Sequence, residues 1–208
     1  ASTLATDHKV LVIDADQQQS IIARRLSDRQ LYPDTVEPYE IRAKNFREVQ
    51  ASLEELDEDF DYIFFDVPGR LDSTVPIAEQ EITKFLYLSD FIFIPIAPGN
   101  FAMESSLKFI QYILKLKKLR SKTENPLADA VVFVNMSEQR TLDDRHLLEE
   151  LEELKTMLNI RFMDNSLNRY ALFRNADTFT SLYDTDTSDK AKQNYTSWFK
   201  EFKAITDG

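Results

Sequence analysis

The stretch Lys9–Gln17, with the sequence KVLVIDADQ, decides the fold of this chain. It is a short apolar run that ends in a carboxylate, Asp14, with Asp16 two residues later. The stretch Asp61–Gly69, with the sequence DYIFFDVPG, is a second apolar run that ends in a carboxylate, Asp66. Continuous apolar runs of this length are typical of strands that are buried on both faces of a parallel sheet. Both runs therefore predict parallel strands that bring acidic side chains to the carboxyl edge of a sheet, where open α/β sheets bind ligands.

Three aspartates become candidates for a functional site through this pattern: Asp14, Asp16 and Asp66. An aspartate at the end of a strand often only caps a helix or lies in a loop, which is the simpler interpretation of Asp14 or Asp16 taken alone. Carboxylates that meet at one edge repel one another unless a cation or a bound proton offsets their charge. The three together favour a site for magnesium and phosphate.

The composition suits a single globular domain over residues 1–208, because 43% of the 208 residues are hydrophobic. The absence of cysteine argues against a disulfide framework or a thiolate metal site and favours a reducing compartment, so we expect a cytoplasmic protein. We expect no membrane association, since no apolar run approaches the roughly 20 residues of a membrane span. A net charge of -11 leaves only a local basic patch as a nucleic-acid surface.

Apolar runs and amphipathic stretches alternate along the chain. We expect strands at 10–14, 39–43, 61–66, 91–96, 130–135 and 160–163. We expect helices at 20–26, 46–56, 75–88, 103–119, 144–158 and 188–205. The last of these helices should dock an aromatic face, which includes Trp198 and Phe199, on the core. This alternation predicts the α/β class, with a mostly parallel central sheet and helices on both faces.

Four segments, taken in order, resemble the ParA/MinD-type partitioning ATPases. The segment Val10–Ser20 resembles the switch of that family, which is a hydrophobic strand followed by Asp-x-Asp-x-Gln. Asp61–Gly69 is similar to the Walker B strand, Ser89–Ile96 to the strand after it, and Val131–Asn135 to the strand whose terminal Asn meets the adenine. The resemblance implies a P-loop NTPase fold of the deviant Walker A type.

The resemblance implies an ATPase that uses ATP and Mg²⁺, with roles for particular residues. Asp16 would orient the attacking water, Asp14 would support the magnesium shell, and Asp66 would be the Walker B carboxylate that holds the ion through water. The first residues, ASTLA, resemble the tail of the family's phosphate loop. On that match Ser2 would ligate magnesium and Thr3 would contact the nucleotide.

Three further residues have both a family role and a simpler interpretation. Pro68 and Gly69 would form a second switch that senses the γ-phosphate, or they form an ordinary type II turn. Asn135 would recognise the base, or it caps the end of its strand. Sequence reasoning alone leaves both pairs of alternatives open.

The glycine-rich phosphate loop of the family has no match upstream of Lys9–Gln17, since the glycines are Gly69, Gly99 and Gly208. That loop wraps phosphates with backbone N–H groups at a helix N-terminus. We expect it to belong to segments of a longer chain outside these 208 residues. Phe64–Gly69 and Ala102–Leu107 are most similar to ParA-like proteins of plasmids and conjugative elements.

The resemblance also implies partners: a homodimer that forms on ATP binding, a ParB-like or adaptor protein that stimulates hydrolysis, and non-specific DNA, with nucleoid association as a consequence. The candidate DNA-binding side chains crowd one helix end: Lys115, Lys117, Lys118, Arg120 and Lys122. Their simpler role is a favourable interaction with the helix dipole and solvent.

Two other functions compete with the partitioning ATPase. A phosphorelay receiver also begins with a strand that ends in an acidic pair, and it carries an acceptor aspartate at a later strand, here Asp66. The continuation Asp66–Gly69 does not suit a receiver, and no Lys-Pro pair follows. A degenerate ParA-like scaffold that no longer hydrolyses ATP is the third possibility.

Overall fold

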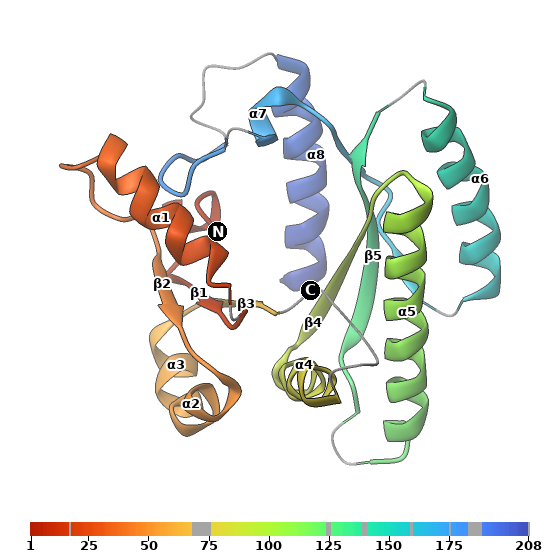
Figure 1. Ribbon diagram of the computed structural model, residues 1–208, viewed down its shortest axis with the longest axis horizontal. Coiled ribbons are helices and arrows are strands. Elements are labelled where there is room, and N and C mark those ends of the chain that lie inside the picture. Colours follow the sequence, from red (N-terminus) through yellow and green to blue (C-terminus); the bar gives the residue numbers. More distant parts are fainter. Residues whose placement is uncertain are drawn as a thin grey trace. The chain divides into compact units, whose positions relative to one another are not determined.

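The computed structural model describes residues 1–16, 18–67, 76–123, 126–138, 141–158, 160–174, 176–182 and 189–207 (Figure 1). The chain forms two compact units, which are described separately below. Unit 1 comprises Ala1–Phe85 and Asn175–Asp186, and unit 2 comprises Leu86–Arg174 and Thr187–Gly208. The expectation of a single domain over 1–208 stays a prediction.

Unit 1 is built on a parallel sheet of three strands in the order β2-β1-β3. Its strands are β1 (Val10–Asp14), β2 (Glu40–Ala43) and β3 (Tyr62–Asp66). Its helices are the 3-10 helix η1 (Leu4–Thr6), α1 (Ser20–Leu31), α2 (Phe46–Ala51), α3 (Leu53–Asp59) and α4 (Pro76–Leu88), which is assigned to unit 2 from Leu86 onward. Every residue of β1 is buried, as the apolar run predicts for a central strand.

The expected helix at 46–56 is interrupted at Ser52. Its predicted start is confirmed, because the Glu48 amide donates to Asn45 Oδ1 over 3.2 Å and the Asn45 amide donates to Glu48 Oε2 over 2.8 Å, which is a capping box. The Ser52 hydroxyl donates back to the Glu48 carbonyl and accepts from Lys44 Nζ, each over 3.0 Å. Such back-bonding competes with the helical ladder and separates α2 from α3.

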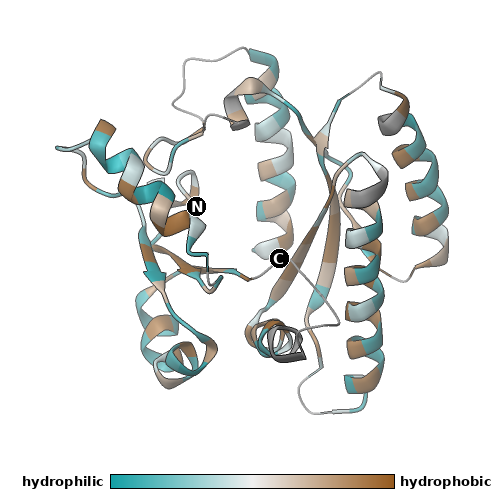
Figure 2. Cartoon of the chain, viewed as in Figure 1, coloured by the Kyte–Doolittle hydropathy of each residue, from teal (hydrophilic) through white to brown (hydrophobic). Residues whose placement is uncertain are grey.

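Unit 2 contains a second parallel sheet in the order β4-β5-β6, with β7 also paired to β5. Its strands are β4 (Phe91–Ile96), β5 (Asp129–Ser137), β6 (Arg161–Phe162) and β7 (Leu167–Asn168). Its helices are α5 (Asn100–Arg120), α6 (Leu142–Met157), α7 (Ala171–Arg174) and α8 (Asp189–Thr206). Apolar residues dominate β4 and β5 (Figure 2).

The sheet of unit 2 is covered on both faces (Figure 1). On one face, α8 packs the aromatic side chains that the sequence predicted, with the Phe202 ring 4.9 Å from Phe93 and the Trp198 ring 5.3 Å from Phe133. Because neighbouring side chains of a strand point to opposite faces, the buried Ile92 and Ile94 face away from α8, on the side where α5 runs along β4.

Every strand pairing among the described residues is parallel. The predicted α/β class, with parallel strands and helices on both sides, is therefore confirmed. Among the described residues, no helix is long and apolar enough to cross a membrane.

Candidate functional site

The carboxyl edge of the unit 1 sheet brings two of the predicted carboxylates together. In the pairing of β1 with β3, Asp14 lies directly opposite Asp66, and each is the last residue of its strand. The Ala15 amide donates to the Asp66 carbonyl over 2.9 Å, so the ladder continues one residue further. This register places both acids at the edge where α/β sheets bind ligands.

Asp14 also fixes the start of α1. The helix follows Gln19, which lies in the left-handed region at φ 48° and provides no side-chain cap. Asp14 Oδ2 instead accepts the amides of Ile21 at 3.1 Å and Ile22 at 3.2 Å. Amides of a first helical turn lack intrahelical acceptors, and the helix dipole favours a negative charge at this end. The Asp14 carboxylate therefore acts as a cap from seven residues upstream.

The second oxygen of Asp14, Oδ1, has no hydrogen-bond partner within the described part of the chain. The residue is 2% exposed, and among the described residues no group donates a hydrogen bond to Oδ1. A buried polar atom left unsatisfied costs about 1–3 kcal/mol. An orphaned carboxylate oxygen at a ligand-binding edge is therefore suited to a cation.

Asp16 shapes the loop between β1 and α1. Its Oδ1 accepts the Gln18 amide over 3.0 Å and its carbonyl accepts the Gln19 amide over 3.0 Å, which is an Asx-type turn. Asp16 remains partly exposed and close enough to Asp66 to affect its titration. Asp16 thus serves as a loop residue, as the simpler interpretation had it, while it contributes charge to the edge.

The pKa of Asp66 responds to its burial and to the two other acids. Burial raises the pKa of Asp66 above its usual value, and the charges of Asp14 and then Asp16 raise it further. A bound cation would reverse this effect by favouring the ionised forms. The acidic cluster, defined as Asp14, Asp16 and Asp66, therefore has the electrostatic character expected of a cation site.

The acidic cluster fits a magnesium ion that is shared with a phosphate better than an ion held by protein alone. Within the described part of the chain, no group of three or more His, Cys, Asp or Glu side chains could hold a metal by itself. Magnesium is commonly held by one or two carboxylates together with substrate phosphates and water. Asp14 Oδ1 and the Asp66 carboxylate are the atoms that suit this role.

The predicted phosphate-loop residues lie just before β1. Thr3 is buried, and Ser181 Oγ donates to its hydroxyl over 3.3 Å, while Ser2 is partly exposed. Both belong to unit 1. Pro68 and Gly69 lie outside the described residues. The roles given to these four residues stay predictions.

Asn135 lies in unit 2, near the end of β5, at an irregular point of the sheet. It pairs with Leu167 of β7, and the next pair is Ser137 with Asn168, so Met136 is left over at φ 56°. Asn135 Oδ1 accepts the Met136 amide over 3.0 Å, as in the strand-end role proposed as its simpler interpretation. Its predicted contact with a base stays untested.

The basic residues at the end of α5 are not equivalent. Lys117 pairs with Asp129, and the Arg120 guanidinium lies 4.0 Å from the centre of the Tyr87 ring. Lys115, Lys118 and Lys122 are exposed. The latter three are therefore the better candidates for phosphate contacts within the predicted DNA-binding set.

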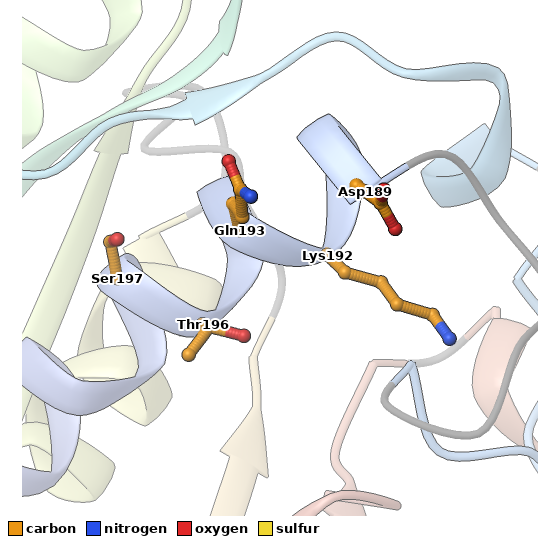
Figure 3. Close-up of a pocket in the computed structure, with 5 residues that line it drawn as sticks. All are labelled: Asp189, Lys192, Gln193, Thr196 and Ser197. Atoms are coloured by element: carbon orange, nitrogen blue, oxygen red, sulfur yellow. The ribbon is translucent and has the colours of Figure 1, made fainter.

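A shallow hollow lies along α8 of unit 2. Figure 3 shows its lining residues on successive turns of this one helix: Asp189, Lys192, Gln193, Thr196 and Ser197. A phosphate or substrate site normally gathers polar groups from several segments. Since these described lining residues come from one helix face, the hollow is not part of the candidate site.

Sequence reasoning missed two charged residues in the middle of α1. Arg25 is 5% exposed and Asp28 is 2% exposed, although both belong to residue types that are rarely buried. Their partners lie about 150 residues further along the chain, in the segment 176–182. No periodicity in the sequence indicates such a contact.

The chain is similar in structure to partitioning proteins. No family model and no curated protein sequence matches it. A solved "Partition Protein" is 17% identical with a TM-score of 0.57, covering 97% of this chain and 65% of that one. A ParA family ATPase from Chlorobium tepidum TLS is 15% identical with a TM-score of 0.51, covering 93% of this chain and 86% of that one.

At such low identities the likeness is one of fold. The chain is thus an α/β protein with a ParA-like fold. The chain spans only 65% of the length of the partition protein that it matches. Activity, cofactors and partners are therefore matters for proposal.

Proposed function

We propose that this chain is part of an ATP-binding and ATP-hydrolysing switch of the partitioning type. The observation that carries the proposal is the in-register pair of Asp14 and Asp66 at the carboxyl edge of β1 and β3, with Asp14 Oδ1 buried and unpartnered among the described residues. The ParA-like fold supports it, since the solved neighbours include an ATPase of that family.

The residues of the acidic cluster take distinct parts in this proposal. Asp14 and Asp66 hold magnesium, which when bound neutralises charge on the phosphates. The amides of Ile21 and Ile22 keep the Asp14 carboxylate oriented while Oδ1 faces the ion. Asp16, on the loop between β1 and α1, orients the water that attacks the γ-phosphate. The nucleotide-binding roles that the family resemblance implies for Ser2, Thr3, Pro68, Gly69 and Asn135 belong to the same proposal.

The wider behaviour belongs to the same proposal. ATP binding promotes a homodimer, the dimer binds DNA without sequence preference through Lys115, Lys118 and Lys122, and a ParB-like or adaptor protein stimulates hydrolysis and release. Phosphate contacts of this kind release counterions and weaken with salt. The exposed position of these three lysines supports their part in it.

The decisive experiment measures ATP binding and phosphate release by the full-length protein, with and without Mg²⁺. We expect Asp66→Asn to lose the magnesium-dependent gain in ATP affinity. We expect Asp16→Asn to bind ATP but to release phosphate about 100-fold more slowly, as is typical when a group that handles the attacking water is lost. The matched control is Asp34→Asn, the same chemical change at an exposed loop position of unit 1.

Two results would contradict the proposal. Wild-type protein that binds no ATP in the presence of Mg²⁺ would leave a ParA-like scaffold. Transfer of the phosphoryl group of acetyl phosphate to Asp66, with release of acetate, would instead identify a phosphorelay receiver. An ATPase should show no such transfer. For the DNA surface, Lys118→Gln should weaken ATP-dependent DNA binding and reduce its salt dependence, whereas the exposed Lys200→Gln on α8 should not.

A further inference from the structure

Helix α1 buries charges and exposes leucines. Arg25 and Asp28 are almost completely buried, whereas Leu26 is 62% exposed and Leu31 is 73% exposed. Burying ionised side chains is costly unless each is paired and hydrogen-bonded. The structure of unit 1 must therefore supply partners for both residues, and it does so through the segment 176–182 (Figure 1).

Thr178 is a hydrogen-bond partner that Arg25 and Asp28 share. Arg25 Nε donates to Thr178 Oγ1 over 2.9 Å and Arg25 Nη2 donates to the Thr178 carbonyl over 3.1 Å. The amide and the hydroxyl of Thr178 donate to Asp28 Oδ2, over 2.8 and 3.0 Å. One threonine is thus held by two successive turns of α1 through its amide, its carbonyl and its hydroxyl.

The guanidinium of Arg25 is enclosed on its other sides. Arg25 Nη1 donates to the Tyr39 carbonyl over 3.0 Å and pairs with Glu37 Oε2 at 3.0 Å. Its central carbon lies 4.4 Å from the centre of the Tyr39 ring and 4.9 Å from that of Phe179. Charge-assisted hydrogen bonds of this kind are stronger than neutral ones, and the planar guanidinium suits contact with aromatic rings.

The segment itself is held in a defined turn. Asp177 Oδ1 accepts the amides of Phe179 and Thr180, over 2.8 and 2.6 Å. The hydroxyl of Tyr32, next to the end of α1, donates to Asp177 Oδ2 over 2.8 Å, and the Tyr32 ring stacks on Phe179 at 5.3 Å. The segment is therefore attached along the second half of α1.

The first half of α1 is attached to the acidic cluster, through the bonds from Ile21 and Ile22 to Asp14 Oδ2. An α-helix rises about 1.5 Å per residue, so Ile22 and Arg25 lie roughly one turn apart on one hydrogen-bonded element. A shift of the helix at Arg25 and Asp28 would therefore move the amides that orient Asp14.

We propose that Arg25 and Asp28 are positioning residues, which fix α1 on the segment 176–182 through Thr178 and thereby set the orientation of Asp14. We call Arg25, Asp28 and Thr178 the clasp. The link from the clasp to Asp14 does not depend on bound magnesium or nucleotide. Its consequence for magnesium binding rests on the proposed function.

The test is amide hydrogen exchange in the full-length protein, residue by residue. Thr178→Val removes the hydroxyl and keeps the shape. We expect exchange at Ile21 and Ile22 to become about tenfold faster, because the hydrogen bonds of this hydroxyl to the charged groups of Arg25 and Asp28 are lost. The Val12 amide, in the central strand β1, should be unchanged. Thr178→Ser should restore protection, and Thr35→Val, at an exposed position, should change nothing.

The outcome that overturns the proposal is faster exchange within 176–182 alone, with Ile21 and Ile22 as protected as in the wild type. Thr178→Val could also accelerate exchange of the Val12 amide by weakening the whole unit. In that case Tyr32→Phe decides whether the clasp acts on Ile21 and Ile22, since it removes only the hydroxyl that binds Asp177. That variant should accelerate Ile21 and Ile22 about threefold, and an unchanged rate contradicts the clasp.

A second readout separates the clasp from the proposed function. Mn²⁺ is used as the probe in place of magnesium, and its affinity is measured by electron paramagnetic resonance in the presence of ATP. We expect Thr178→Val to weaken Mn²⁺ binding about fivefold and Thr178→Ser to restore it. If the wild type binds no Mn²⁺, the proposed function fails, while the exchange rates at Ile21 and Ile22 still decide the clasp.

Discussion

Two aspartates of unit 1, Asp14 and Asp28, are buried to the same extent and differ in their partners. Each is 2% exposed. Asp28 uses both oxygens, since Oδ1 pairs with Arg24 Nε at 2.9 Å and Oδ2 accepts two hydrogen bonds from Thr178. Asp14 uses Oδ2 only, and among the described residues its Oδ1 has no hydrogen-bond partner. Burial alone therefore does not distinguish a carboxylate that stabilises the fold from one that is kept for a ligand.

The largest effect that separates the two residues is expected in stability. Asp28→Asn removes the charge that pairs with Arg24, and we expect the free energy of unfolding to fall by about 3 kcal/mol, at the low end for a broken buried ion pair because Arg24 is half exposed. Asp14→Asn keeps an acceptor for the amides of Ile21 and Ile22 and should cost less than about 1 kcal/mol. Urea denaturation measures both.

Asp34→Asn, at an exposed position, is the control for this comparison and should leave the urea midpoint unchanged. An equal loss in Asp14→Asn and Asp28→Asn would show that Asp14 is a structural residue like Asp28. The proposal of a cation site at Asp14 would then lose its main support.

The sequence predicted that Asp14 and Asp66 lie at one sheet edge, because each strand carries a local pattern. An apolar run that ends in a carboxylate predicts both the strand and the residue at its carboxyl end. The register of β1 with β3 then places the two carboxylates opposite each other. The long strands and helices were predicted for the same reason, since each has a periodic pattern of its own. The short elements η1, β7 and α7 were not predicted, because a few residues carry no period.

The sequence did not predict the clasp, because its contacts depend on tertiary structure alone. The helix expected at 20–26 includes Arg25 but ends before Asp28, whereas α1 in fact extends to Leu31. No sequence pattern singled out Thr178. Only the fold shows that the charges face inward and the leucines outward, so tertiary partners have overridden the hydrophobic pattern.

The second effect in size concerns magnesium. With ATP present and Mg²⁺ at ten times its dissociation constant, an ion that binds only the folded state stabilises that state by about 1.4 kcal/mol. For a chain of this length that should raise the Tm of the wild type by about 4 °C. Asp14→Asn should abolish the increase, and the same increase in that variant would show that the ion binds elsewhere. Thermal unfolding with Na⁺ at equal ionic strength controls for general salt effects.

A third, smaller effect follows from the repulsion within the acidic cluster. The pKa of Asp66 is raised above 3.8, so between 3.8 and the raised value the folded protein binds more protons than the unfolded chain. The free energy of unfolding therefore falls as pH rises through that interval. Asp66→Asn should remove this decrease and raise the Tm at pH 7 by about 2 °C without Mg²⁺. A lower Tm in Asp66→Asn would mean that Asp66 stabilises the fold.

The smallest effect on stability is expected at Asp177. There the free energy of unfolding changes with pH in the direction opposite to that at Asp66. Burial alone would raise the pKa of Asp177, but the hydrogen bonds from Thr180, Tyr32 and Phe179 outweigh burial and hold the pKa below 3.8. The unfolded chain therefore binds more protons in the interval below 3.8, and the stabilisation present above that pH is lost as pH falls through the lowered pKa.

Acid titration of the Tm should therefore be less steep below pH 3.8 in Asp177→Asn than in the wild type. The effect is small because Asp177 is only partly buried and solvent screens its charge. Asp34→Asn supplies the baseline for removing an exposed carboxylate. If the slopes of Asp177→Asn and wild type agree below pH 3.8, the turn of the segment 176–182 is held by contacts other than the Asp177 carboxylate, and the attachment to α1 then depends on Thr178.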